Sequence, residues 1–309
     1  MKLLIVGAGG QLGGSVARQA VAHGELVVAT YLARPPTVDS ATVERFDKTD
    51  TVAARALLAR HRPEVVIDTG ALHNVDFCES HPEEANRVNR DATAELARVS
   101  RDVGARFLFV STDFVFDGGG HPPYQESDAP HPQSVYARSK LEGERAVLGV
   151  SSENLVVRPS VIYSWLDTRY RASSSSGKGV NFGTWLVEEV RHGREVRIVE
   201  DQVASPTLAE DLAAAILALV GQPEGGVFHA AGATALDRYS FSVRLVERLG
   251  LDGKMVHPVR TAELNQKAAR PSNSALDSRR LLAVAGHRML ALDGALDRFA
   301  DAVHRDPGY

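Results

Sequence analysis

Three residues that together could move a proton to a carbonyl oxygen occur near one another in the chain: Thr112, Tyr136 and Lys140. Tyr136 and Lys140 are four residues apart, a spacing that places both side chains on one face of a helix. A free tyrosine has a pKa of about 10, and a neighbouring ammonium group favours the phenolate and lowers that pKa. We therefore expect Tyr136 to protonate an oxygen that Thr112 holds by a hydrogen bond. Alone, the YxxxK spacing is common on ordinary helices.

A glycine-rich turn strengthens this interpretation, because it could hold a cofactor. The segment GAGGQLG (7–13) lies between an apolar run and a helix-like segment, and its glycines are spaced by three. Small residues let the backbone approach a pyrophosphate, and the following helix supplies amide donors and the positive end of its dipole. The sequence therefore predicts a dinucleotide site, with an ordinary glycine turn as the alternative. The residues expected at the cofactor here are Gly7, Gly10, Gln11, Leu12 and Gly13.

The end of the second apolar run favours NADP(H) over NAD(H). Sites for NAD place an acidic residue at this point to bind the ribose hydroxyls. Here LVVATY (26–31) ends at Tyr31 and is followed by Leu32, Ala33 and Arg34, with no acid. The Arg34 guanidinium could bind a 2′-phosphate through two hydrogen bonds. We expect Tyr31 and Arg34 at the cofactor; a solvated loop arginine is the alternative.

Apolar strand-like runs alternate with helical segments through the first half of the chain. The expected strands are 3–6, 26–31, 42–46, 64–68, 106–110 and 154–158. The expected helices are 11–24, 51–61, 82–104 and the segment that carries Tyr136 and Lys140. Strands that are apolar throughout and separated by helices predict a parallel sheet covered on both faces. The predicted fold is therefore α/β, a Rossmann-type doubly wound parallel sheet with a smaller C-terminal α/β substrate-binding lobe.

The second half of the chain is less regular. Helices are expected at 182–193, 208–220 and 239–250, and short strands at 196–199 and 226–230. The polar segment 165–179 contains four consecutive serines and predicts a long loop. We expect residues 1–160 to form the dinucleotide-binding core. Residues 161–309 are expected to form mainly the substrate-binding lobe, with some segments returning to the core.

Composition excludes several classes of protein. Hydrophobic residues make up 44% and charged residues 24% of the 309 residues, as in ordinary soluble proteins. A net charge of −4 gives no basic field for nucleic acid or an anionic membrane, and no apolar run is long enough to span one. The single cysteine, Cys78, suits a reducing compartment, so a cytoplasmic location is expected. The 11 histidines show no ligand spacing, so no metal site is predicted.

Motifs spread over almost the whole chain resemble extended short-chain dehydrogenases/reductases, and more narrowly the dTDP-4-dehydrorhamnose reductase (RmlD-like) family. They are GAGGQLG (7–13), VDFCES (75–80), EEANRVN (83–89), STDFVFDG (111–118), YARSKLEGE (136–144), DQVASPT (201–207) and RPSNSALD (270–277). The resemblance implies NADPH-dependent reduction of the 4-keto group of a nucleotide-activated, preferably dTDP-linked, 6-deoxyhexulose. It also implies that Thr112 orients the substrate oxygen, Tyr136 is the acid, and Lys140 holds the nicotinamide ribose.

The resemblance adds further cofactor contacts. Asp47 and Lys48 would flank the adenine, and the segment from Asp68 to Leu72 would line the path of the ribose and pyrophosphate. Within that segment the expected contacts are Gly70, Ala71 and Leu72, and Arg158 is expected at the cofactor as well. The family usually has Asn-Ala-Ala-Ala here, whereas this chain has Asp68-Thr69-Gly70-Ala71. We expect the groove to be kept with different hydrogen bonds.

Substrate contacts are expected at Asp113, Phe114, Val161, Gln202, Ser205 and Arg270. Phe114 stands where the family usually has tyrosine, and Val161 where it often has a tryptophan near the sugar. Both departures leave the identity of the hexose open. Asp113 could instead cap backbone amides of its loop. Arg270 could bind a diphosphate or form a structural ion pair.

Two other functions fit parts of the same pattern. The family also resembles the regulatory β subunit of methionine adenosyltransferase, which keeps the dinucleotide fold and acts as a binding partner. An epimerase or dehydratase of nucleotide sugars is the second alternative, because Asp113 follows Thr112 as an acid does in dehydratases. The expected partner is a nucleotide-sugar substrate, and assembly as a homodimer stays open.

Overall fold

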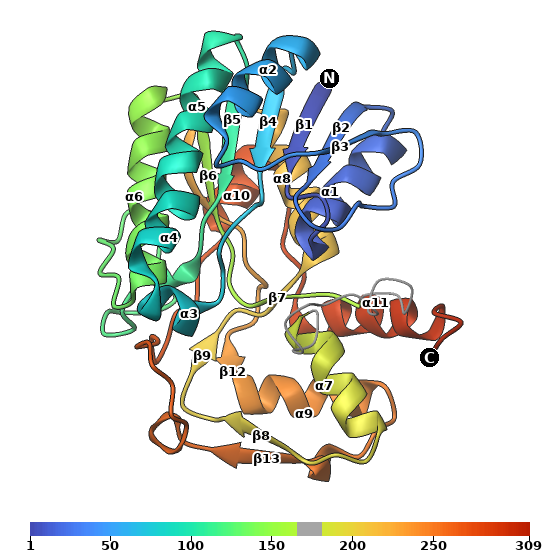
Figure 1. The fold of residues 1–309 in the computed structure, drawn as a ribbon. Coiled ribbons are helices and arrows are strands. Elements are labelled where there is room, and N and C mark those ends of the chain that lie inside the picture. Colours follow the sequence, from blue (N-terminus) through green and yellow to red (C-terminus); the bar gives the residue numbers. More distant parts are fainter. Residues whose placement is uncertain (166–180) are drawn as a thin grey trace.

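The computed structural model describes residues 1–165 and 181–309, so the predicted loop at 165–179 lies outside the described residues except for Trp165. Within these residues, seven parallel strands form the central sheet in the order β11-β6-β5-β4-β1-β2-β3 (Figure 1). The strands are β1 (Lys2–Val6), β2 (Leu26–Tyr31), β3 (Thr42–Arg45), β4 (Val65–Asp68), β5 (Arg106–Val110), β6 (Leu155–Arg158) and β11 (Gly226–His229). The order reverses between β1 and β4, as in Rossmann-type folds, and the predicted fold class is confirmed.

Helices cover both faces of the sheet (Figure 1). On one face lie α1 (Gln11–Ala22), α8 (Ala209–Val220) and α10 (Arg279–Ala285); on the other lie α2 (Thr51–His61), α5 (Ala92–Asp102) and α6 (Val135–Val150). Side chains of a strand point alternately to the two faces. Leu3 and Ile5 of β1 therefore join the first layer, and Leu4 and Val6 join the second. This double burial explains why the strands are apolar throughout.

A second lobe lies below the carboxyl ends of the sheet strands in Figure 1. Its helices are α7 (Phe182–Arg191), α9 (Arg238–Arg248) and α11 (Leu292–His304), packed around Tyr163, Phe241 and Phe299. Its short strands pair as β8 (Val196–Val199) with β13 (Val256–Val259), β9 (Val203–Ala204) with β12 (Leu236–Asp237), and β7 (Ile162–Tyr163) with β10 (Thr207–Leu208). The elements α8, α10 and β11, although late in the chain, pack in the core of the sheet.

The predicted single helix at 82–104 is wrong in one respect. The segment is divided into α4 (Pro82–Asn86), a π-helical turn η1 (Arg87–Asp91) and α5. The turn lies against α6 so closely that a Cβ on Gly143 would be 2.6 Å from the carbonyl oxygen of Asn89. Such turns insert one residue into a helix and often occur at functional sites. Sequence periodicity does not register the inserted residue.

Four short elements complete the described fold. They are α3 (Val75–Ser80), η2 (Asp113–Val115), η4 (Gly253–Met255) and η5 (Thr261–Glu263). Among the described helices, none is both long and apolar enough to cross a bilayer. Two residues, the polar Ser111 and Thr112, stand between the end of β5 and the turn η2.

Candidate active site

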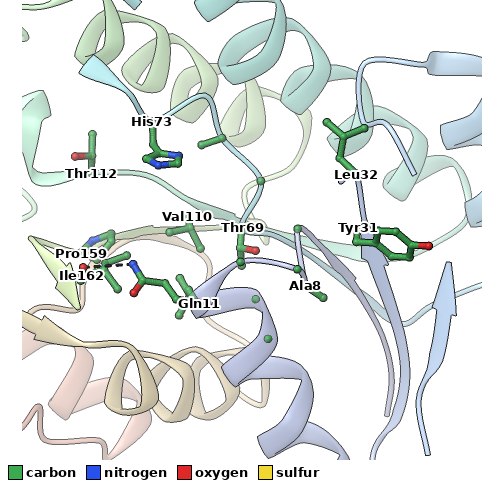
Figure 2. A pocket seen from close by; sticks show the side chains of 18 of the residues that line it. Ala8, Gln11, Tyr31, Leu32, Thr69, His73, Val110, Thr112, Pro159 and Ile162 are labelled. Carbon is green, nitrogen blue, oxygen red and sulfur yellow. Dashed lines mark hydrogen bonds between the residues drawn. The ribbon is translucent and has the colours of Figure 1, made fainter. Parts of the chain in front are cut away.

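A cavity of about 610 Å³ opens at the carboxyl ends of β1, β2, β4 and β5, within the range typical of small-molecule sites. Open parallel sheets bind ligands at this edge, where the strand order reverses. Figure 2 shows side chains from the glycine loop, the strand ends and the start of the second lobe converging on it. The predicted residues on its wall are Gly7, Gly10, Gln11, Leu12, Gly13, Tyr31, Arg34, Gly70, Ala71, Thr112, Asp113, Phe114, Tyr136, Lys140 and Val161.

The glycine loop has the shape that a dinucleotide requires. A Cβ on Gly13 would lie 2.5 Å from the carbonyl oxygen of Gly7, and Gly7 itself has a φ of 85°. Gly10 caps α1 without a side-chain hydrogen bond, and the first turn of the helix contains no acid. The amide donors and the positive dipole end of α1 therefore face the cavity, and no side chain at the start of the helix accepts hydrogen bonds from these amides. This donor set fits a pyrophosphate, so the residues present suit a dinucleotide cofactor.

At the β2 end, the cavity wall contains Tyr31, Leu32, Arg34 and two prolines that follow Arg34. Two further residues expected beside the adenine do not line this wall. Asp47 accepts hydrogen bonds from the backbone nitrogen and hydroxyl of Thr49, which lowers the pKa of its carboxyl group. Lys48 is turned inward, away from solvent.

Lys48 forms a buried ion pair with Asp68 at the end of β4. Its Nζ donates to an Asp68 carboxylate oxygen at 2.6 Å, to the Gly70 carbonyl at 2.8 Å and to the Thr93 hydroxyl at 2.9 Å. Asp68 also accepts at 3.0 Å from the backbone nitrogen of Gly70. Lys48 therefore fixes the loop after β4 from its buried side. Asp68 stands where the family usually has asparagine, and the groove is kept. The loop after β4 is held by an ion pair, because a buried charge needs a partner of opposite charge.

The loop after β4 is held by a residue that the sequence interpretation missed. Asn89, wholly buried in the π-helical turn, accepts from the Leu72 backbone nitrogen at 2.9 Å and donates to the Leu72 carbonyl at 3.0 Å. Its amide also donates to the Ser139 hydroxyl at 3.1 Å, next to Lys140. Asn89 thus ties the cofactor side of the site to α6. Leu72 does not line the cavity, since this contact fixes its backbone behind the wall. The available signal was the motif EEANRVN (83–89), which contains Asn89.

Thr112, Tyr136 and Lys140 all reach the cavity wall, as predicted from their spacing. Thr112 follows β5 and its hydroxyl accepts from the Phe114 backbone nitrogen at 3.2 Å. Tyr136 lies in the first turn of α6, which Ser134 caps by accepting from the Ala137 nitrogen. The turn after β5 and the start of α6 therefore bring together hydroxyls that are 24 residues apart in sequence.

The expected direction of the Tyr136 pKa shift is wrong. Burial raises the pKa of this phenol, hydrogen bonding with Thr112 lowers it, and the Asp113 charge raises it further. Lys140 is not among the groups that shift it, because the ammonium points elsewhere. Its Nζ donates to the Val110 carbonyl at 2.6 Å and lies 3.9 Å from the centre of the Phe109 ring. Tyr136 is therefore a protonated phenol at neutral pH.

Lys140 has an unusual environment for a lysine. It is 1% exposed, and burial lowers its pKa from 10.5 to about 7, with the nearby Lys48 charge acting in the same direction. The carboxylates of Asp68 and Glu144 partly oppose this shift. A lysine whose pKa lies near neutrality can change charge when an anionic ligand binds.

Asp113 lies on the cavity wall next to Thr112, and its carboxylate accepts hydrogen bonds from three hydroxyls. It accepts from Ser160 at 2.7 Å, from Ser274 at 2.5 Å and from Thr112 at 3.2 Å. Burial raises the pKa of its carboxyl group, whereas these hydroxyls lower it. Asp113 therefore links the β5 end to the segment around Ser274.

The two positions that depart from the family pattern both lie on the cavity wall. The Phe114 ring packs edge-on against Tyr136, with ring centres 6.3 Å apart. Val161 has a φ of 39°, a left-handed conformation that is strained for a β-branched residue. Strain of this kind persists where the surroundings hold it, commonly at ligand sites.

Four other predicted site residues lie off the cavity wall. Arg158 is buried and forms an ion pair with Glu144 at 2.6 Å, so it braces β6 against α6. The Arg270 guanidinium binds the Asp76 carboxylate at 2.9 and 3.2 Å, the structural ion pair that was the alternative for it. Gln202 donates to the Thr261 hydroxyl, and the Ser205 hydroxyl accepts from the Leu276 nitrogen.

Several residues on the wall were not singled out from the sequence. His73 projects into the cavity from the loop after β4, across from Thr112 (Figure 2). Gln11, which was predicted at the cofactor, also has contacts that the sequence did not indicate: it donates to the Ile162 carbonyl at 3.3 Å and accepts from the Ser164 hydroxyl at 3.0 Å, which joins the glycine loop to the second lobe (Figure 2). Arg238 reaches the wall from α9. Neither His73 nor Arg238 belongs to a local motif, since each is brought to the cavity only by the fold.

The described part of the chain contains no cluster of three or more histidine, cysteine or acidic side chains that could hold a metal ion. Cys78 is buried, and burial raises the pKa of its thiol to about 11. A thiol with this pKa is a poor nucleophile, because the reactive species is the thiolate.

Comparisons with known proteins agree with this geometry. The family model described as RmlD substrate binding domain matches residues 1–305. The dTDP-4-dehydrorhamnose reductase of Mycobacterium tuberculosis is 40% identical over 284 residues, which cover 90% of this chain and 85% of that protein. A crystal structure of a dTDP-4-dehydrorhamnose reductase from Clostridium acetobutylicum superposes with a TM-score of 0.83 at 29% identity, over 98% of this chain and 100% of that one.

A second solved structure, dTDP-4-dehydrorhamnose reductase from Bacillus anthracis in complex with NADP, has a TM-score of 0.83 at 25% identity. It covers 97% of this chain and 99% of its own. The similarity therefore extends over both the sheet and the second lobe. The chain belongs to the RmlD substrate binding domain family of nucleotide-sugar reductases.

Proposed function

We propose that the protein is an NADPH-dependent reductase of the 4-keto group of a nucleotide-activated, preferably dTDP-linked, 6-deoxyhexulose. The observation that carries the proposal is the placement of Thr112, Tyr136 and Lys140 on one cavity wall, continuous with the glycine loop. The similarity to dTDP-4-dehydrorhamnose reductases supports the same substrate class. Function follows from the site rather than from the fold, and here both agree.

The chain's own residues have distinct tasks in this reaction. A nicotinamide cofactor, when bound, supplies the hydride. Tyr136 protonates the substrate oxygen, and its raised pKa keeps the phenol protonated at neutral pH. An alkoxide is a stronger base than a phenolate, so the phenol remains a competent acid. Thr112 hydrogen-bonds the same oxygen, and Lys140 is placed to hold the cofactor ribose.

The preference for NADP(H) over NAD(H) is part of the proposal. It rests on Arg34 at the cavity wall and on the lack of any acidic residue from Tyr31 to Thr37. A guanidinium suits the doubly charged 2′-phosphate, whereas an acid there would repel it. The B. anthracis reductase was solved with NADP, which supports the same choice. A cytoplasmic location and a homodimer remain predictions from the sequence.

The decisive experiment mixes the purified protein with NADPH and dTDP-4-keto-6-deoxyhexoses of either C5 configuration, and follows loss of NADPH absorbance. We expect oxidation of NADPH with at least one of these sugars. Absence of oxidation with every nucleotide-sugar ketone would contradict the proposal. Co-purification with a synthetase would then favour the regulatory alternative, and conversion without net NADPH loss would favour an epimerase.

The acid assignment has its own test. Replacing Tyr136 by phenylalanine removes the proton donor and should lower turnover by about 10²- to 10⁴-fold, with NADPH affinity little changed. Tyr163→Phe is the matched control, because that hydroxyl lies in the second lobe and has no hydrogen-bond partner among the described residues. Turnover by Tyr136→Phe equal to that of the control would show that another group supplies the proton.

A further inference from the structure

Arg238 is the first residue of α9 and the one cation that the second lobe contributes to the described cavity wall. Its guanidinium lies over the Phe182 ring, 4.5 Å from the ring centre. Among the described residues, the Arg238 side chain forms no ion pair and donates no hydrogen bond. A guanidinium carries five N–H donors, so this side chain faces the cavity with its donors available.

The neighbouring charges do not neutralise Arg238. The charge of Asp113 acts on Arg238, but the Asp113 carboxylate already accepts hydrogen bonds from three hydroxyls. Arg270, the cation expected to meet a diphosphate, pairs with Asp76, and its charge repels that of Arg238. Lys140 donates to the Val110 carbonyl. The substrate half of the cavity therefore has an excess of positive charge concentrated on Arg238.

The backbone holds Arg238 in a defined position. Its nitrogen donates to the Gln202 carbonyl at 3.1 Å, and Asp237 caps α9 by accepting from the Ser240 nitrogen at 2.8 Å. The amide groups at the start of α9 add a partial positive charge beside the guanidinium. Burial lowers the pKa of Arg238 to about 10, which still leaves it fully protonated at neutral pH. A rigid, desolvated cation binds an anion more strongly than a mobile surface lysine does.

We propose that Arg238 binds the diphosphate of the nucleotide-sugar substrate and thereby sets which end of the hexose faces Tyr136. This inference rests on the proposed function and assigns to Arg238 the role that the sequence suggested for Arg270. The diphosphate is attached to C1, across the sugar ring from the C4 oxygen. Arg238, the cation that the second lobe contributes to the cavity wall, would bind that side of the substrate. Arg238 is accordingly a specificity-determining residue.

The test measures equilibrium binding of dTDP, dTMP and thymidine by calorimetry, without catalysis. In Arg238→Gln we expect dTDP affinity to fall about 10- to 100-fold, since one charged hydrogen-bonding group is lost. The loss should be smaller for dTMP and small for thymidine, and NADPH affinity should be unchanged. Arg238→Lys keeps the charge but cannot form two parallel hydrogen bonds to the diphosphate, so it should give an intermediate loss of dTDP affinity.

Arg244→Gln is the matched control, because Arg244 lies on the same helix and pairs with Asp293 on the surface. Its dTDP affinity should equal that of the wild type. Equal dTDP affinity in Arg238→Gln and the control would overturn the inference while leaving the reductase activity intact. Failure of the wild type both to bind dTDP and to reduce any nucleotide sugar would overturn the proposed function together with it. If Arg238→Gln does not fold, unaltered dTDP affinity in Arg238→Lys would overturn the two-pronged contact.

Discussion

Substituting Gly13 by alanine should destabilise the protein and weaken cofactor binding. Gly13 lies in the first turn of α1, and a Cβ there would be 2.5 Å from the Gly7 carbonyl oxygen and 2.6 Å from the Thr69 hydroxyl. The first of these neighbours is backbone of the glycine loop, so it can yield only if the loop moves. Overpacking of this kind costs about 1–3 kcal/mol. Alanine in a helix gains about 0.5–1 kcal/mol over glycine, which offsets part of that.

The net effect follows from these two contributions. A loss of about 1–2 kcal/mol in unfolding free energy is expected, or about 2–3 °C in Tm for a chain of 309 residues. Movement of the loop also displaces its amide donors, and loss of one charge-assisted hydrogen bond corresponds to about tenfold weaker NADPH binding. Thermal denaturation monitored by circular dichroism and NADPH titration by fluorescence measure the two effects.

Gly149→Ala separates helix propensity from steric clash. Gly149 lies in α6, and nothing is within 4 Å of the position of an added Cβ. Alanine should therefore stabilise the protein slightly, by about 0.5–1 kcal/mol, without effect on NADPH. The reasoning would be refuted if Gly13→Ala melted as high as Gly149→Ala and bound NADPH as tightly as the wild type.

Three further perturbations have defined outcomes. Burial lowers the Lys140 pKa from 10.5 to about 7, so between these pH values the unfolded chain binds one more proton than the folded chain. The unfolding free energy of the wild type, relative to that of Lys140→Met, should therefore rise with pH in this range by up to about 1.4 kcal/mol per pH unit. A pH-independent difference in urea denaturation would contradict this. Asp68→Asn leaves the Lys48 ammonium buried without its carboxylate partner and should lower the unfolding free energy by about 3–5 kcal/mol. Adding Lys48→Met to the same chain should restore most of this loss. No restoration would mean that the two residues are not coupled. Arg34→Gln should raise KM for NADPH about tenfold and leave KM for NADH unchanged, and equal changes for both cofactors would remove Arg34 from 2′-phosphate recognition.

The meeting of Thr112, Tyr136 and Lys140 at one cavity was predictable because its signals are local. The spacing of Tyr136 and Lys140 determines their common helix face, and Thr112 directly follows a strand whose end must lie at the ligand-binding edge. The glycine loop is equally local, since Gly7 to Gly13 span one strand-to-helix turn. These patterns depend on backbone geometry within a few residues, which the sequence specifies directly.

Charge partners were much less predictable. Lys48 and Arg270 are of the residue types expected at an adenine or a phosphate. Lys48 instead pairs with Asp68, and Arg270 pairs with Asp76, which is 194 residues away in the chain. Arg238 and His73 carry no motif and reach the cavity only because the second lobe and the β4 loop meet there. Pairing between distant residues depends on the final packing, which the hydrophobic periodicity of the sequence does not predict.

The sequence by itself determined the fold class, because that follows from the period of strands and helices. It also predicted the glycine turn as the cofactor site and Tyr136 as the proton donor, from the steric freedom of glycine and from local spacing. Only the tertiary structure decided the electrostatic state of the site. The Tyr136 pKa is raised, against the expectation from its spacing to Lys140, because burial acts on the phenol while the ammonium is directed at the Val110 carbonyl. Burial and solvation are properties of the packed chain, so they appear only once all the elements are in place.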